Sequence, residues 1–252
     1  MRAFMIGTKT KGEIDMMRLA GQVVGQTIVE VSKYIKPGIT TGELDKIGEE
    51  FIRSKGMLPA FKGLYGFPGS ICISLNEQVV HGIPGDRVLK EGDIITLDVG
   101  ATYKGWNGDG AATFGVGKIS DEAQNLIKVT REATYIGIDQ MRLGQHLYDI
   151  SNAIHDYVEK QGYSVVTQYV GHGIGRKVHE EPQVPNFRQP VRGMQLKKGM
   201  CLAIEPMVNV GGAETVVMPD EWTVVTKDGK LSCHWEHSAA ITDGAPLILT
   251  LP

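Results

Sequence analysis

Two segments of this chain, residues 89–98 and 196–205, repeat one pattern. Each begins with Leu-Lys-x-Gly, continues for five residues and ends on a carboxylate, Asp98 in the first segment and Glu205 in the second. Both acids directly follow apolar residues typical of a buried strand. A chain that contains the same strand and the same acid twice is expected to fold into two similar halves.

The match extends on both sides of these segments. His-Gly-Ile precedes each one, and an acid that begins a run of small residues follows each one; these residues are His81 and Asp109 in the first copy, His172 and Glu236 in the second. The order histidine, acid, acid therefore occurs twice. We expect two α/β halves related by a pseudo-twofold axis, with a site between them to which each half contributes a histidine and two acids.

The hydrophobic spacing predicts both helices and strands. Apolar residues recur at intervals of three, four or seven over 14–35, and Pro37-Gly38 ends this helix. Thr40 and Glu43 predict a capping box at the start of a second helix. Further helices are expected at 120–141 and 147–157, and strands at 71–75, 94–99, 111–116 and from 165 onward.

Length and composition suit one globular domain. Of 252 residues, 42% are hydrophobic, which is enough to bury a sizeable core. No linker or low-complexity stretch divides the chain, so we expect a single catalytic domain over residues 13–252 after a short extension at 1–12. A net charge of −3 gives no nucleic-acid footprint.

Cysteine usage and hydropathy indicate the compartment. The three cysteines, Cys72, Cys201 and Cys233, are odd in number and form no CxxC pair, which suits a reducing environment. Residues 1–13 lack the apolar core of a secretory signal, and no apolar run approaches the ~18 residues of a membrane span. We expect a cytoplasmic protein with no membrane partner and no recognition of a nucleic-acid sequence.

The four repeated acids are the first candidates for chemistry. A carboxylate beside a buried strand is costly unless it is paired; the plain alternative for Asp98 is a strand end that faces solvent. Asp109 follows across a glycine-rich stretch, a spacing that predicts a hairpin returning it beside Asp98. The alternative is an Asp109-Gly110 turn. The matching acids Glu205 and Glu236 weaken both alternatives.

Converging carboxylates favour a metal site. Without cations they would repel one another and take up protons. Two divalent ions would balance four acids, and mixed carboxylate and imidazole ligands suit Mn, Fe, Co or Zn better than Mg. A two-metal site activates water and stabilises a tetrahedral transition state. The sequence therefore predicts a hydrolase that uses two divalent metal ions.

Among the seven histidines, His172 is the best ligand candidate, because glycines on both sides allow close backbone packing. His179 and His81 are candidates to donate a hydrogen bond to a substrate carbonyl or a developing oxyanion. For any one of them a structural role is the plain alternative. The sequence assigns no role to His234 or His237.

Two segments show a family resemblance. Residues 74–84, Ser-Leu-Asn-Glu-Gln-Val-Val-His-Gly-Ile-Pro, resemble the segment before the first metal ligand of methionine aminopeptidases. Residues 169–182, which start Tyr-Val-Gly-His-Gly-Ile-Gly and end His-Glu-Glu-Pro, are similar to the type 1 enzymes. Only 31 positions separate Glu205 from Glu236, which leaves no room for the type 2 insertion. The resemblance covers the chain from about residue 13 onward.

The resemblance implies an α/β (α+β) fold and an activity. The fold is the pita-bread fold, in which two pseudo-twofold related α/β halves surround a curved antiparallel sheet. The activity is metal-dependent removal of the initiator methionine from nascent proteins and peptides when the second residue is small. The partners are thus the N-termini of new chains, which emerge at the ribosome, and we expect the enzyme to be a monomer.

The resemblance also implies a role for each metal ligand. Asp98 would bind one ion, His172 and Glu205 would bind the other, and Asp109 and Glu236 would bridge both. Glu205 would in addition carry the proton of the attacking water.

Substrate contacts are implied in the same way. His81 and His179 would contact the scissile peptide. The methionine pocket would be lined by Phe67, Cys72 and Trp222, with a contribution from Leu64. This chain departs from many bacterial relatives in having Val178, where they have a Phe immediately before the second histidine.

Two other functions remain open from the sequence. A proline-directed relative, such as aminopeptidase P or prolidase, resembles this fold but usually has an additional N-terminal domain. A metal-free module of the same fold would bind peptides without cleaving them, and such modules typically lose ligands. Stoichiometric uptake of metal distinguishes an enzyme from this second alternative.

Overall fold

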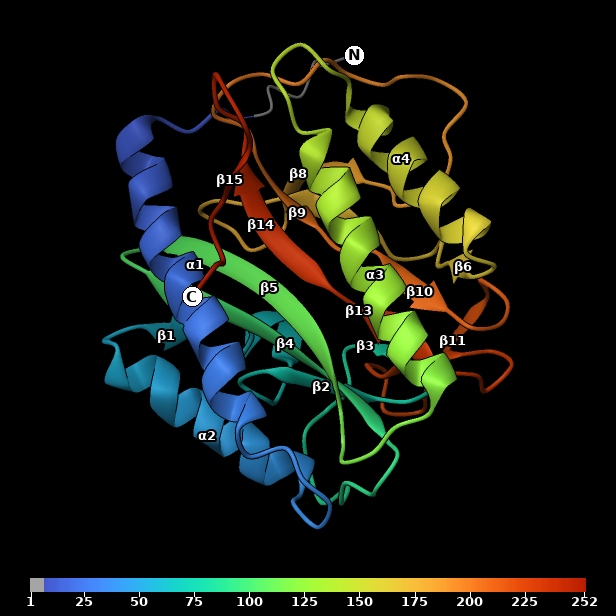
Figure 1. The fold of residues 1–252 in the computed structure, drawn as a ribbon. Coiled ribbons are helices and arrows are strands. Elements are labelled where there is room, and N and C mark those ends of the chain that lie inside the picture. The colour runs from blue at the N-terminus through green and yellow to red at the C-terminus, as the bar shows by residue number, and fades with distance from the viewer. Residues whose placement is uncertain (1–6) are drawn as a thin grey trace.

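The computed structural model describes residues 7–252. Within this range the helices are α1 (Lys11–Ser32), α2 (Thr41–Ser54), α3 (Asp121–Asp139) and α4 (Leu147–Lys160), and a 3₁₀ turn, η1, spans Leu64–Gly66. Figure 1 shows α1, α3 and α4 in front of a curved sheet, with α2 beside α1. None of the helices in the described range is long and apolar enough to cross a membrane.

A nine-stranded sheet forms the centre of the molecule. The main path is β1-β4-β5-β14-β9-β7-β8, while β2 pairs with β4 and β15 pairs with β14. Every neighbouring pair is antiparallel. The strands are β1 (Leu58–Pro59), β2 (Cys72–Leu75), β4 (Ile94–Tyr103), β5 (Trp106–Gly115), β7 (Gly171–Gly173), β8 (Glu180–Val184), β9 (Cys201–Ile204), β14 (Glu236–Ala240) and β15 (Leu247–Ile248).

Two three-stranded sheets complete the strand pairing in the described residues. The first has the order β13-β10-β6 and consists of Ser232–His234, Met207–Asn209 and Ser164–Val165. The second has the order β11-β12-β3 and consists of Thr215–Val217, Val224–Thr226 and Gln78–Val80. This second sheet places the end of β3, from the first half of the chain, beside β12 from the second half.

The repeated segments occupy equivalent places in the main sheet. The first segment leads into β4 and the second into β9. Strand β4 pairs with β5, strand β9 pairs with β14, and β5 and β14 pair with each other at the centre of the sheet. At this seam, as we call the contact between β5 and β14, Ala111 faces Glu236 and Gly110 faces His237. Read outward from the seam, β5-β4 therefore mirrors β14-β9, which confirms the expected two halves around an antiparallel sheet.

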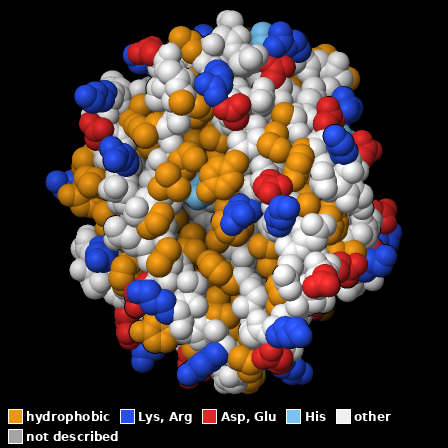
Figure 2. Space-filling model, viewed as in Figure 1, with side chains coloured by type: hydrophobic (Ala, Val, Ile, Leu, Met, Phe, Trp, Pro, Cys, Tyr) orange, Lys and Arg blue, Asp and Glu red, His pale blue; other side chains and the backbone are white. Residues whose placement is uncertain are grey.

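Each half has its own hydrophobic core. Val24 of α1 and Leu44 of α2 belong to one cluster, and Leu126 of α3 and Ile154 of α4 belong to another. Burying one such side chain stabilises the fold by roughly 1.5–3 kcal/mol. On the helix-covered face, charged side chains of both signs surround hydrophobic ones (Figure 2).

The first helix differs from its predicted range of 14–35. It begins earlier, because Thr10 and Glu13 form a capping box that the sequence analysis did not identify. It ends at Ser32, and the amide of Ile35 bonds the carbonyl of Ser32, three residues back rather than four. This tighter turn takes Ile35 out of the α-helix.

The predicted extension at 1–12 is described only in part, because residues 1–6 lie outside the described range. The Lys9 amide bonds the carbonyl of Gly199 at 2.7 Å. The Lys9 ammonium forms an ion pair with Glu180 at 2.8 Å, and only 7% of the lysine side chain is exposed. The described end of this segment is thus attached to the second half.

Candidate metal centre and substrate pocket

Neighbouring strands of the main sheet bring the predicted ligands to one site. The sheet order places them side by side: Asp98 on β4, Asp109 on β5, Glu236 on β14, Glu205 directly after β9 and His172 on β7. All five line one cavity of about 260 Å³. The repeated acids predict this convergence, and the strand order explains it.

The first two acids come from a single hairpin, as predicted. Asp98 faces Ala111 and Asp109 faces Gly100 in the β4–β5 register, so the two acids are near neighbours on adjacent strands. The chain reverses at Lys104 and Gly105, which both have positive φ angles of 47° and 75°. The alternative of an Asp109-Gly110 turn is therefore wrong, since both residues lie within β5.

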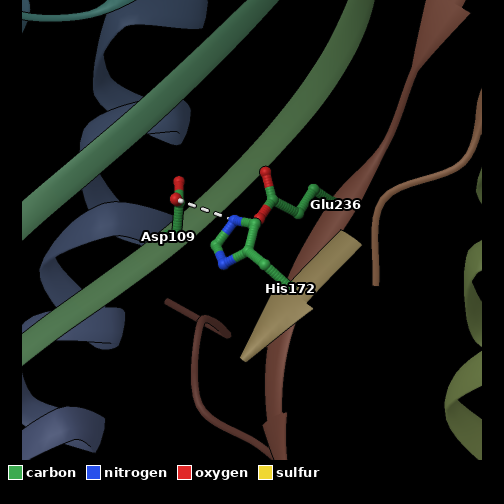
Figure 3. Close-up of side chains that lie close together, drawn as sticks. All are labelled: Asp109, His172 and Glu236. Carbon is green, nitrogen blue, oxygen red and sulfur yellow. Dashed lines mark ion pairs between the residues drawn. The ribbon is translucent and has the colours of Figure 1, made fainter. Parts of the chain in front are cut away.

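His172 lies between the acids of the two halves. Its Nε2 atom is 3.3 Å from Glu205 Oε1 and 3.8 Å from Asp109 Oδ2. Figure 3 shows the imidazole between the carboxylates of Asp109 and Glu236. The other ring nitrogen, Nδ1, is 2.9 Å from the carbonyl of Gly173, which fixes the ring with Nε2 toward the acids.

The site holds its acids in an unfavourable electrostatic environment. Burial raises the pKa of Asp98 to about 7. Burial and the charges of the other acids raise the pKa values of Asp109, Glu205 and Glu236 well above their ordinary range. Because each acid opposes the ionisation of the others, a fully ionised set requires cations among its oxygens.

The donor atoms fit divalent metal ions. One oxygen of each acid is buried without a hydrogen-bond partner: Asp98 Oδ1, Asp109 Oδ1, Glu205 Oε1 and Glu236 Oε1. Such atoms are normally satisfied in proteins. Two groups of side chains offer ligand atoms within 4.8 Å of one another, namely Asp109, His172 and Glu236, and Glu205, His234 and Glu236. Glu236 belongs to both groups, and carboxylate oxygens with imidazole nitrogens suit transition metals.

His234 also lines the cavity, although the sequence assigns it no role. Its Nε2 atom lies 3.9 Å from Glu205 and 3.8 Å from Glu236, and the side chain is 2% exposed. Burial lowers its pKa to about 3. The signal was its position two residues before Glu236, because alternate residues of an extended chain share a face. His237 instead contacts Tyr135 and Thr250.

His179 approaches His172 directly. The two rings form an edge-to-face pair with centroids 4.5 Å apart. The ring of Tyr65 stacks on His179 at 6.1 Å. Burial lowers the pKa of His179, so its imidazole is neutral at pH 7.

His81 lines the same cavity but not as the counterpart of His172. It follows β3 with a positive φ of 59° and packs edge-on against Tyr169. His172 faces Ala203 within the main sheet, whereas in the first half Ser74 occupies that register position, opposite Thr96. The predicted equivalence of the two histidines is wrong, because the chain between β2 and β4 leaves the main sheet to form β3.

Clustered apolar side chains form another part of the cavity, its apolar wall. The predicted residues Phe67, Cys72, Trp222 and Leu64 all line it, together with Phe61, Tyr65 and Val80. Phe67 and Trp222 form an edge-to-face pair at 5.2 Å. Val178 packs behind them in one cluster with Phe61, Phe67 and Cys72. The cavity can therefore hold an uncharged side chain beside the acids.

Comparison with known proteins agrees with this geometry. Residues 15–243 match the model of metallopeptidase family M24. A methionine aminopeptidase of Clostridium perfringens is 55% identical over 247 residues, which cover 98% of this chain and 99% of that protein. Methionine aminopeptidase 1 of Bacillus subtilis is 52% identical over 98% of this chain and 99% of its own length.

Solved structures extend the comparison. Methionine aminopeptidase from Thermotoga maritima superimposes with a TM-score of 0.97 at 44% identity, covering 98% of this chain and all of that one. Prolidase from Pyrococcus furiosus, at 22% identity and a TM-score of 0.78, shares the fold; this chain covers 65% of its length. These likenesses confirm the pita-bread fold. The chain belongs to metallopeptidase family M24, and within it to the methionine aminopeptidases.

Proposed function

We propose that this protein removes the N-terminal methionine from peptides and new proteins whose second residue is small. The observation that supports this best is the apolar wall of Phe67, Cys72 and Trp222, which opens directly onto the acid and histidine cluster. A methionine side chain against that wall would place its peptide bond beside the acids. Because the residue held there would be the one with the free N-terminal amine, only the first peptide bond of the substrate would be cleaved.

Family M24 uses divalent metal, and we propose two ions in this site. Their ligands would be Asp98, Asp109, His172, Glu205 and Glu236, and Glu236 belongs to both groups of close donor atoms. The ions would be Mn, Fe, Co or Zn, which accept carboxylate and imidazole donors. When bound, they make water more acidic and neutralise the charge that develops in the transition state.

The protein's own groups would manage the proton. Glu205 lies at the end of β9, with its carboxylate 3.3 Å from His172. Burial and the neighbouring acids raise its pKa, which makes it a good proton acceptor. We assign it to take a proton from the attacking water and to give one to the leaving amine.

Two histidines would hold the scissile peptide. Burial lowers the pKa of both His81 and His179, so each is a neutral imidazole that donates from one ring nitrogen. Such a donor stabilises the oxygen charge that develops on the carbonyl more than it stabilises the ground state. His179 lies against His172 and would contact the carbonyl, and His81, which lines the same cavity, would contact the peptide as well.

The partners follow from this activity. The working unit would be a monomer. The substrate would be the N-terminus of a polypeptide leaving the ribosome, in the cytoplasm.

A cleavage assay tests the proposal. Metal-stripped protein is incubated with Met-Ala-x, Met-Leu-x and Ala-Pro-x peptides, with and without Co, Mn or Fe. We expect methionine to be released from Met-Ala-x alone, and only when metal is added. Release of alanine from Ala-Pro-x would instead assign the protein to the proline-directed activity. Stoichiometric metal uptake with no cleavage of any peptide would contradict the proposed substrate.

A further inference from the structure

The seam between the two halves contains few direct main-chain contacts. Only the pairs Ala111 with Glu236 and Gly110 with His237 are in ladder register between β5 and β14. Two residues before and two residues after Ala111 on β5, a side-chain hydroxyl bonds the main chain of the opposite strand in place of direct main-chain hydrogen bonds. The two hydroxyls belong to Ser238 and Thr113.

Ser238 binds both main-chain groups of Asp109. Its Oγ atom accepts the Asp109 N–H at 3.1 Å and donates to the Asp109 carbonyl at 2.7 Å. The serine is 0% exposed. One hydroxyl on β14 thus does what two direct hydrogen bonds would do in a regular ladder.

Thr113 makes the same contact in the opposite direction. Its hydroxyl donates to the carbonyl of His234 at 2.7 Å and accepts the His234 N–H at 3.3 Å. The hydroxyl of Thr96 lies 2.8 Å away, and it must be the donor in that contact because the Thr113 hydrogen is already used. Thr113 is 2% exposed.

Both hydroxyls hold residues whose side chains enter the acid cluster. Asp109 comes from the first half and His234 from the second, and each is held by a residue of the other half. An inserted hydroxyl keeps two strands further apart than a direct N–H···O=C bond, while it still satisfies the buried main-chain groups. The hydroxyls therefore set how far apart the two halves stand at the cluster.

We propose that Ser238 and Thr113 are positioning residues, which hold Asp109 and His234 at the separation that two metal ions require. This inference rests on the proposed metal site. Without the hydroxyl, the strands either leave buried main-chain groups unpaired or close up into a direct ladder, and both changes move Asp109 or His234.

The test measures metal affinity on the full chain. Mn²⁺ is titrated by calorimetry into metal-stripped wild type, Ser238→Ala, Thr113→Val and Thr113→Ser, and kcat and KM are measured with Met-Ala-x. We expect Ser238→Ala and Thr113→Val to weaken Mn²⁺ binding about 10- to 100-fold, as loss of groups that orient ligands does. Their kcat should fall while KM changes by less than about threefold. Thr113→Ser, which keeps the hydroxyl, should bind Mn²⁺ as the wild type does.

Thr27→Val is the matched control. The Thr27 hydroxyl is equally buried, but it donates to the carbonyl of Val23 within α1 and so does not join the two halves. We expect this variant to lower Tm but to leave Mn²⁺ affinity unchanged. If Ser238→Ala and Thr113→Val likewise lowered Tm and left Mn²⁺ affinity unchanged, the hydroxyls would be ordinary structural groups. That result would overturn the inference.

The two proposals fail in different ways. If the wild type binds Mn²⁺ but does not cleave Met-Ala-x, the proposed substrate is wrong, while the ratio of affinities still decides the role of the hydroxyls. Should Ser238→Ala not fold, the comparison of Thr113→Val with Thr113→Ser decides it alone.

Discussion

Asp109 interacts with side chains from both halves of the molecule. It is 3% exposed and lies 3.8 Å from His172, and its charge raises the pKa values of Glu205 and Glu236. Burial raises the pKa of Asp109 itself, and the charge of Asp98, its neighbour on the hairpin, raises it further. Such a residue is costly to bury, and cations are the simplest compensation that these side chains can accept.

Replacing Asp109 with Ala should abolish turnover. Groups that merely orient a metal ligand are worth 10–100-fold, so loss of a ligand itself should reduce kcat/KM by at least about 100-fold. The measurement is Met-Ala-x cleavage together with Mn²⁺ stoichiometry. Asp139→Ala is the control, because that side chain is 61% exposed at the end of α3. Full activity of Asp109→Ala would refute the two-metal assignment.

Trp222 should act on substrate binding rather than on chemistry. Its ring packs edge-on against Phe67 at 5.2 Å. Trp222→Leu removes this aromatic pair, which is worth about 0.5–1.5 kcal/mol, so KM for Met-Ala-x should rise up to about tenfold with kcat little changed. Phe51→Leu on α2 is the control and should have normal kinetics. A fall in kcat alone would argue against a pocket role.

At the scale of elements, two glycines allow α1 to pack closely against the last residues of the chain. A Cβ atom on Gly21 would lie 2.4 Å from the Leu249 carbonyl oxygen, and one on Gly25 would lie 2.4 Å from that of Thr250. The Leu249 amide also bonds the carbonyl of Ser238, on β14. The helix thus holds the final segment against the strand that contains Glu236.

Gly25→Ala should destabilise the protein, because main-chain atoms cannot move aside as a flexible side chain can. Overpacking of this kind costs about 1–3 kcal/mol. Gly12→Ala, in the same helix, meets no atom within 4 Å and should instead be neutral or stabilise by up to about 1 kcal/mol. Urea unfolding of both variants measures the difference. Equal stabilities would show that the chain end is not held by α1.

At the scale of the whole molecule, folding brings together acids that are far apart in sequence. Burial raises their pKa values, that of Asp98 to about 7, above the values near 4 of an unfolded chain. The folded metal-free protein therefore holds protons that the unfolded chain releases. The contribution of these raised pKa values to the free energy of unfolding is present below about pH 4 and is lost as the pH rises toward about 7.

Metal should therefore stabilise the protein more at higher pH. Mn²⁺ competes with protons for the same oxygens, so its binding energy grows as the acids ionise. We expect saturating Mn²⁺ to raise Tm by at least about 4 °C more at pH 7.5 than at pH 5.5. In a chain of this size a difference of 1 kcal/mol in stability shifts Tm by about 2–4 °C. Asp98→Asn should reduce this difference. An equal rise at both pH values would mean that these acids do not bind the metal.

Much of this protein could be read from local sequence patterns. The repeated strand and acid predicted the two halves, and the spacing of Asp98 and Asp109 predicted their hairpin. The Thr40–Glu43 capping box was also predicted and is confirmed. Each of these depends on residues close together in the chain, or on a pattern that occurs twice.

What the sequence did not determine is which strands lie beside which. The seam joins β5 to β14, residues far apart in the chain, so the Ser238 hydroxyl could not be matched to Asp109, nor Thr113 to His234. The seam also placed His234 in the site, while the pairing of β3 with β12 took His81 out of the position of His172. Hydrogen bonds between strands depend on register, and register is fixed only when both halves pack together. Local sequence thus determined the chemistry of each half, and tertiary structure determined how the two halves share one site.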